Sequence, residues 1–254
     1  MKAFAVIKRS HLIVGLVAVL AVAVIVLGSV LSSTQAVAER KLPVYSVEDD
    51  KRIAITFDAS WGAERTMGIV DALYERGLKA TFFLTGIWIS AYPEETLYIH
   101  DHGMEIGNHS DHHYNMGKMT KEQCLEEIIS VNRQVYGLTG AYPTLFRAPF
   151  GDYGNTLIDT LEGIGMRCIQ WDVDSLDWKG LDAATLYERI TNGVQGGSII
   201  LCHNNSEHIL EALPKILDDL TQEGYEFVTV SELLRGKEGT IDRTGKLHAA
   251  RQGG

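Results

Sequence analysis

The sequence predicts an α/β domain in which most strands are parallel. Short apolar runs recur along the chain, segments with helical periodicity separate them, and the connections are long enough to contain helices. The expected strands are Arg52–Phe57, Ala80–Thr85, Glu105–Asn108, Leu145–Arg147, Arg167–Val173, Ser198–Cys202 and Glu226–Val230. An open doubly wound sheet and a closed barrel both satisfy this pattern. No glycine-rich fingerprint follows the first strand, which disfavours dinucleotide and phosphate-loop folds.

The segments between these runs carry helix signals. Ile69 and Leu73 share one apolar stripe. Thr120 precedes Gln123 by three residues, which is the spacing of a capping box at a helix start. The expected helices are 64–76, 120–136, 156–162, 183–193 and 209–223.

Length and composition describe a folded, acidic domain. The chain has 254 residues, of which 45% are hydrophobic and 22% charged, enough to bury a full core. The first 38 residues hold three of the 23 basic residues and no acids, so the remainder carries 20 basic against 33 acidic residues. This balance argues against a nucleic-acid partner. The cysteines are too few for a disulfide framework, and we expect buried, hydrophobic roles for Cys168 and Cys202, with no pairing assigned to Cys124.

The N-terminal segment predicts export. Residues 12–31 are almost uninterrupted Leu, Val, Ile and Ala after a basic cluster, which fits a membrane anchor or a long secretory segment. Ala36-Val37-Ala38 matches a cleavage site, so both outcomes stay open. The basic flank places the domain outside the cytoplasm, anchored or secreted. The expected parts are a signal peptide or anchor over 1–38, a linker over 39–51, a domain over 52–235 and a mobile polar tail over 236–254.

Five polar groups share one feature, because each follows the carboxyl end of an expected strand. They are Asp58-Ala59, His109 to His113, Arg147 to Gly151, Asp174 to Trp178, and Leu201-Cys202-His203. In a parallel βα architecture these ends converge on one face, so residues far apart in sequence meet in one pocket.

His109 and His113 are candidate metal ligands. They are four residues apart, so a helical turn beginning there would place both imidazoles on one face, where they suit zinc, cobalt or nickel. Exposed or helix-capping histidines are the alternative, and His112 leaves open which ring faces inward.

The other polar groups suggest acid and base chemistry. Asp58 is a candidate general base, metal ligand or strand-end cap, and Arg147 is the candidate that keeps it ionised, unless it forms a surface ion pair. His203 is placed to protonate a leaving group if Asp174 or Asp177 orients it; a buried structural histidine is the alternative.

Aromatic residues offer surfaces for sugar stacking. Most tryptophans are simply core residues, but Trp178 directly follows an acidic candidate. We therefore expect Trp178, with Trp61 behind it, to contact substrate.

Taken together, these motifs resemble those of the polysaccharide deacetylase family, the NodB-homology carbohydrate esterases of family 4. Within that family they are similar to a sporulation-associated subgroup of endospore-forming bacteria. The resemblance spans Arg52 to Leu234 with the motifs in the family's order. It implies a distorted (β/α) barrel of about seven parallel strands, a divalent metal such as zinc or cobalt, and removal of acetyl groups from N-acetylated sugars of peptidoglycan or chitin-like glycans. We expect a monomer.

The resemblance carries over by position. Asp58 stands at the catalytic base of the first motif, and His109 and His113 stand at the metal-binding histidines. Arg147 matches the arginine that orients the base. Phe150 stands where the family has a tyrosine whose backbone N–H helps to hold the oxyanion.

The last two motifs also match. Asp177 resembles the acid that tunes the catalytic histidine, and Trp178 resembles the tryptophan that shapes the groove. His203 resembles the general acid.

Ala59 departs from the family pattern. It replaces the family's second aspartate, the third protein ligand of the metal, and a methyl group cannot coordinate a cation. Asp58, Glu64, His112 or substrate would have to complete such a site. The resemblance therefore implies a glycan N-deacetylase, with a glycan-binding pseudoenzyme or hydrolysis without metal as alternatives.

Overall fold

The computed structural model describes residues 17–22 and 39–250. The chain divides into two units, Met1–Glu39 and Arg40–Gly254. In the first unit, residues 17–22 are helical and exposed, and the rest of the expected anchor over 12–31 lies outside the described residues. Within the described residues, no helix has the length and apolar character needed to cross a membrane.

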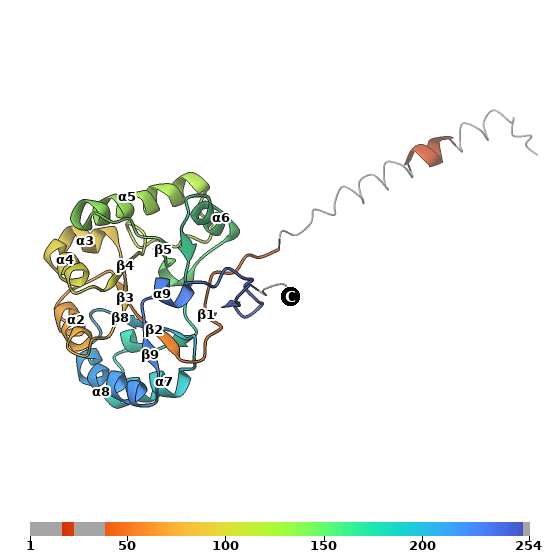
Figure 1. The fold of residues 1–254 in the computed structure, drawn as a ribbon. Helices are drawn as coiled ribbons and strands as arrows, with labels where there is room; N and C mark the ends of the chain where they lie inside the picture. The colour runs from red at the N-terminus through yellow and green to blue at the C-terminus, as the bar shows by residue number, and fades with distance from the viewer. Residues whose placement is uncertain (1–16, 23–38, 251–254) are drawn as a thin grey trace, which may run out of the picture. The chain divides into compact units, whose positions relative to one another are not determined.

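The second unit alternates strands and helices (Figure 1). The strands are β1 (Ser46–Val47), β2 (Arg52–Ala59), β3 (Thr81–Leu84), β4 (Glu105–Asn108), β5 (Leu145–Phe146), β6 (Arg167–Cys168), β7 (Val173–Asp174), β8 (Ile199–His203), β9 (Glu226–Phe227) and β10 (Lys246–Leu247). The α-helices are α2 (Thr66–Tyr74), α3 (Gly86–Ala91), α4 (Pro93–Asp101), α5 (Lys121–Thr139), α6 (Asn155–Gly163), α7 (Ala183–Gly193), α8 (Ile209–Gln222) and α9 (Val230–Leu234). Two 3₁₀ turns, η1 (Pro149–Gly151) and η2 (Asp177–Lys179), follow β5 and β7.

The main sheet is parallel and curled. Its seven strands lie in the order β6–β5–β4–β3–β2–β8–β7, and β9 pairs with the first residues of β2. Helices α2 to α8 lie around the outside of the strands (Figure 1). The predicted parallel α/β architecture is confirmed, but the sheet is a half-barrel because β6 and β7 do not pair with each other.

The single strand expected over 167–173 is wrong, because this segment forms β6 and β7 at opposite ends of the sheet. The backbone N–H of Ile169 donates to Phe146 O of β5 at 2.8 Å, whereas that of Asp172 donates to Ile199 O of β8 at 3.2 Å. The chain changes partner between these two residues. Residues 169–172 therefore connect the two edges of the half-barrel.

The helix starts follow the capping signals. Thr120 and Gln123 form the expected capping box at the start of α5. A second capping box, between Thr229 and Glu232, begins α9 and explains why the strand expected over 226–230 ends at Phe227. The sequence interpretation missed α3, α4 and α9; α3 and α9 have only six and five residues, whereas α4 has nine, as do α2 and α6.

Strand β2 separates the outer core from the barrel interior. Ile53, Ile55 and Phe57 pack in the large apolar cluster that also contains residues of α2 and α8. Thr56 and Asp58 alternate with them and point to the other face, where both contact the same arginine. The cysteines are buried and unpaired, as expected for Cys168 and Cys202.

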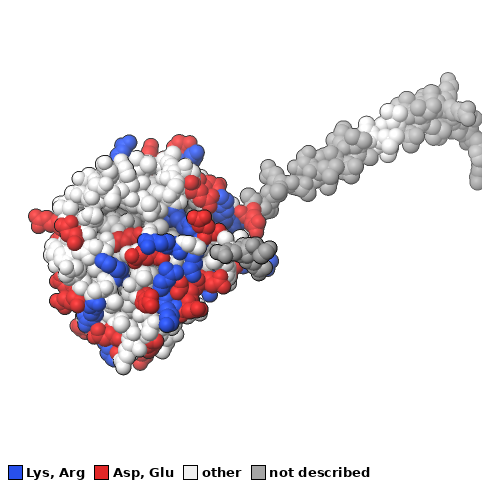
Figure 2. Space-filling model, viewed as in Figure 1, with Lys and Arg blue, Asp and Glu red and all other residues white. Residues whose placement is uncertain are grey.

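The segments expected as a linker and a mobile tail differ from that expectation. Strand β1 pairs in parallel with β10, and Leu247 is buried against the core. Arg52 binds Asp49, and Lys237 donates to the carbonyl of Glu48. Figure 2 shows acidic and basic side chains intermingled on the face that carries α9. Residues 44–47 and 237–248 thus pack with the domain; its limits at 52 and 235 stay a prediction.

Candidate active site

Asp58 lies at the carboxyl end of β2 and forms a buried ion pair with Arg147, which follows β5. The distance from Arg147 Nη1 to Asp58 Oδ1 is 2.8 Å, and the arginine is fully buried. The guanidinium also donates to Thr56 Oγ1 at 2.7 Å and lies 4.1 Å from the ring centre of Phe83. Burial alone would raise the pKa of Asp58, but the charge of Arg147, aided by nearby histidines, lowers it. Asp58 therefore stays ionised, and Arg147 is not a surface residue.

His203 lies beside Asp58 at the end of β8, where the two residues are in register on neighbouring parallel strands. Its Nδ1 lies 2.7 Å from Oδ1 of Asp177, and its backbone N–H donates to Oδ2 at 2.8 Å. Burial lowers the pKa of His203, but the hydrogen bond and charge of Asp177 raise it overall. His203 thus favours the protonated form, and its Nε2 is the atom left to meet a substrate.

The choice between Asp174 and Asp177 is resolved by geometry. Asp174 Oδ1 accepts from the backbone N–H of Leu176 at 2.9 Å, in a local turn. Asp177 is 1% exposed and holds His203 through both of its oxygens. Asp177 is therefore the orienting carboxylate.

His109 and His113 face the same pocket, but from a loop instead of the expected helical turn. Their ring centres are 5.0 Å apart. His109 Nδ1 contacts the carbonyl of Arg147 at 2.8 Å, which leaves Nε2 facing Asp58 Oδ2 at 3.4 Å. Burial lowers the pKa of His109, and burial with the nearby His109 lowers that of His113 to about 4. Both imidazoles are thus neutral near pH 7.

The loop that carries the histidines has an uncommon backbone. Ser110 and His113 have φ values of 65° and 58°, a left-handed conformation that costs about 1–2 kcal/mol for each non-glycine residue. His112 turns away from the pocket and pairs with Glu127 of α5. The question of which ring faces inward is therefore resolved in favour of His113.

The donor set does not fit a metal site with three protein ligands. Among the described residues, no group of three His, Cys, Asp or Glu side chains is arranged to hold a cation. Ala59 is fully buried in the apolar cluster with Phe57. Neither Glu64 nor His112 lines the pocket, so neither replaces the missing carboxylate.

The pocket has a volume of about 830 Å³, which is large enough for sugar residues. Trp61, Phe150 and Trp178 line it and are 65%, 66% and 62% exposed. The His113 ring lies edge-on to Trp61 at 4.9 Å and to Phe150 at 4.5 Å between ring centres. The structure thus brings all of the sequence-predicted site residues together, apart from Arg147, which lies beneath the pocket.

Several lining residues were missed from sequence. They are Ser60, Trp171, Gly180 and the loop 204–207, which follows His203 directly. Ser60 and the loop 204–207 have no signal beyond their position after a strand, because small polar loop residues carry no characteristic pattern. Trp171 was given no role in substrate binding, because most tryptophans are core residues, but it lines the pocket.

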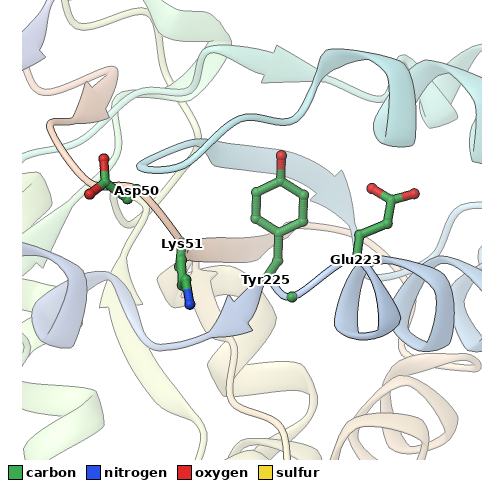
Figure 3. Close-up of a pocket in the computed structure, with 5 residues that line it drawn as sticks. Asp50, Lys51, Glu223 and Tyr225 are labelled. Carbon is green, nitrogen blue, oxygen red and sulfur yellow. The ribbon is translucent and has the colours of Figure 1, made fainter.

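A second cavity, of about 540 Å³, lies at the opposite end of β2 (Figure 3). Asp50, Lys51, Glu223 and Tyr225 line it, next to the first residues of β2 and β9. It contains no histidine and no buried ion pair. The pocket at the carboxyl ends is therefore the candidate active site.

Comparison with known proteins agrees with this geometry. Residues 46–169 match the family model described as polysaccharide deacetylase. A Bacillus subtilis protein named peptidoglycan-N-acetylmuramic acid deacetylase PdaA is 32% identical over 195 residues, which cover 74% of this chain and 73% of that protein. The chain belongs to the polysaccharide deacetylase family.

Other relatives in the polysaccharide deacetylase family differ in length and in activity. A Listeria monocytogenes protein named peptidoglycan-N-acetylglucosamine deacetylase PgdA is 33% identical over 76% of this chain, but the match spans only 41% of that protein. A family 4 pseudoenzyme from Bacillus anthracis has a TM-score of 0.74 at 28% identity, covering 81% of this chain and 72% of that one. A mutant of that pseudoenzyme is described as having restored enzymatic activity.

Proposed function

We propose that this polysaccharide deacetylase binds an N-acetylated amino-sugar glycan, of peptidoglycan or a related polymer, and hydrolyses its acetamide. One observation carries the proposal: Asp58 and His203 lie in register and line one pocket, where Arg147 lowers the pKa of Asp58 and Asp177 raises the pKa of His203. An ionised carboxylate beside a protonated imidazole is the pair that amide hydrolysis needs. The names of the relatives, which act on N-acetylglucosamine or N-acetylmuramic acid of peptidoglycan, support the substrate class.

In the proposed reaction, Asp58 accepts a proton from a water molecule that attacks the acetamide carbon. The tetrahedral intermediate then breaks its C–N bond as His203 donates a proton to the departing nitrogen. Acetate and a free amino sugar result. Asp177 keeps His203 oriented, Arg147 keeps Asp58 ionised, and the backbone N–H of Phe150 is our candidate donor to the oxyanion.

His109 and His113 remain the proposed ligands of zinc or cobalt. Because the chain supplies no third ligand at Ala59, no step of this reaction is assigned to a metal. Binding would require water or substrate oxygens to complete the coordination.

We further propose an exported domain that acts on the cell wall, held by residues 12–31 if that segment is not cleaved. The names of the cell-wall-acting relatives support export. A role in sporulation rests on the sequence resemblance alone.

Acetate release tests the proposed activity directly. The full chain is incubated with chitopentaose and with defined peptidoglycan fragments, with a chelator, with zinc or with cobalt, beside an Asp58→Asn variant as the matched control. We expect acetate from the parent and about 10²- to 10⁴-fold less from the variant, the usual contribution of a general base. No acetate from the parent under any condition refutes catalysis.

Ala59 favours a second candidate, a glycan-binding pseudoenzyme. The pocket and its aromatic rim do not depend on residue 59, whereas a third metal ligand does. The Bacillus anthracis pseudoenzyme shows that this fold occurs without activity. Binding of chitopentaose to a parent that releases no acetate, measured by calorimetry, would establish this candidate in place of the first.

A further inference from the structure

The position of His113 depends on a loop that helix α5 holds at several points. Asn132 of α5 accepts a hydrogen bond from Asn108 Nδ2 at 2.8 Å, where β4 ends. Gln134 of α5 donates to Asp111 at 3.2 Å. The N-terminal residues of α3 also donate backbone hydrogen bonds to the carbonyls of 110 and 111. The start and middle of the loop are therefore fixed before His113 is reached.

Glu127 holds His112, the residue just before His113. Its Oε2 accepts from the backbone N–H of His112 at 2.9 Å, and its Oε1 lies 2.9 Å from His112 Nδ1. Glu127 is only 8% exposed although it is a carboxylate, and both of its oxygens are used on this one residue. A buried glutamate with both oxygens on one partner fixes that partner's backbone and side chain together.

His113 itself has little that would fix it. Its Nδ1 is buried without a hydrogen-bond partner among the described residues, and its ring lies near the rings of Trp61, His109 and Phe150. Its backbone has a φ of 58°, which is a strained conformation for histidine, and its N–H bonds to Ser110 Oγ at 3.0 Å. The direction of the ring must therefore come from the chain on either side of it.

We propose that Glu127 is a positioning residue, which directs the His113 ring into the pocket by holding His112 against α5. The carboxylate binds His112 on the outside of the loop, and the left-handed turn at the next residue points His113 inward. Among the described residues, the hydrogen bonds and ion pair of Glu127 all go to His112, and Glu127 does not line the pocket. This inference extends the proposed function, but the arrangement of the loop does not require that function to be correct.

Three variants of the full chain test the proposal. Glu127→Ala removes both contacts, whereas Glu127→Gln keeps an acceptor for the His112 N–H. Glu126→Ala changes the preceding residue, which is exposed on the same helix, and serves as the matched control. The His112 side chain is half exposed, so water can take the place of the Glu127 carboxylate in the alanine variant. We therefore expect the variant to fold, and circular dichroism checks this.

The primary readout is the NMR signal of the His113 ring, assigned by comparison with His113→Gln. We expect Glu127→Ala to shift and broaden this signal, and Glu126→Ala and Glu127→Gln to leave it near that of the parent. Chitopentaose turnover should fall about 10–100-fold in Glu127→Ala through kcat, the range seen when a supporting contact to a site residue is lost.

The outcomes separate the two proposals. If the His113 signal of Glu127→Ala coincides with that of the parent, Glu127 is structural only and the inference is wrong. If the parent releases no acetate, the deacetylase function fails, while the NMR comparison still decides the role of Glu127.

Discussion

Asp58 and His203 lie opposite each other on β2 and β8 and have their pKa values displaced in opposite directions. Arg147 lowers the pKa of Asp58 and so favours its ionised form, and Asp177 raises the pKa of His203 and so favours its protonated form. Two neighbouring strands thus bring a carboxylate and an imidazole to one pocket. The pKa of each is shifted by a buried partner, Arg147 for the carboxylate and Asp177 for the imidazole.

Replacing Asp177 with Asn should deactivate His203. The amide has one oxygen to accept from the backbone N–H of His203, so its NH₂ group faces Nδ1 and favours the wrong tautomer. We expect acetate release at pH 7 to fall about 10²- to 10⁴-fold, with the alkaline limit of activity moved to lower pH. An unchanged pH profile in steady-state assays would contradict this role.

The pH dependence of acetate release should be bell-shaped and wide. The base works only when ionised, so activity is lost as the pH falls through the pKa of Asp58, below its ordinary 3.8. The acid works only when protonated, so activity is lost as the pH rises through the pKa of His203, above its ordinary 6.5. Profiles of kcat/KM measured with chitopentaose will check both limits; an alkaline limit below pH 6.5 would count against His203.

Replacing Arg147 with Met should destabilise the fold strongly. The change leaves the Asp58 carboxylate buried without its partner, which costs about 3–5 kcal/mol of unfolding free energy. Arg76→Met, at the partly exposed pair with Asp218, is the control and should cost under about 1 kcal/mol. Urea denaturation of both variants measures the loss of unfolding free energy. Equal losses would show that the buried ion pair contributes no more to stability than the partly exposed one.

Replacing Ala59 with Asp should make stability depend on zinc. The new carboxylate enters an apolar cluster beside Phe57, so the variant should melt at a lower temperature than the parent in a chelator. If the carboxylate joins His109 and His113, zinc at about a hundred times its Kd restores about 2.7 kcal/mol.

The comparison for this change is Ala59→Asn, which has nearly the same shape without the charge. Thermal unfolding and acetate release are measured for parent and both variants with zinc and with chelator. A zinc shift of equal size in all three proteins would show that residue 59 does not reach the cation.

The strand-end residues were predictable because the signal is local. Asp58, Arg147 and His203 each end or follow an apolar run, and parallel strands bring such ends together whatever their exact register. The partner of His203 was not fixed by sequence, because Asp174 and Asp177 both follow the same run. In the structure, Asp174 accepts from the backbone N–H of Leu176 in a turn, whereas Asp177, which follows this turn, faces His203.

Features that depend on distant contacts were not predictable. The segment over 167–173 looks like one strand, because nothing in its composition shows that its first half pairs with β5 and its last residue with β8. His113 was expected on a helical turn because a spacing of four residues is typical of helices. Its backbone is left-handed instead, and the residues just before it contact α5, which begins eight residues later in the chain.

The pairing of β1 with β10 bears on how the protein can be shortened. A fragment trimmed to residues 52–235, as composition alone would suggest, loses both of these strands and uncovers Ile169 and Ile199, against which Val44, Val47 and Leu247 are clustered. A shortened version of the domain should therefore begin before β1 and end after β10.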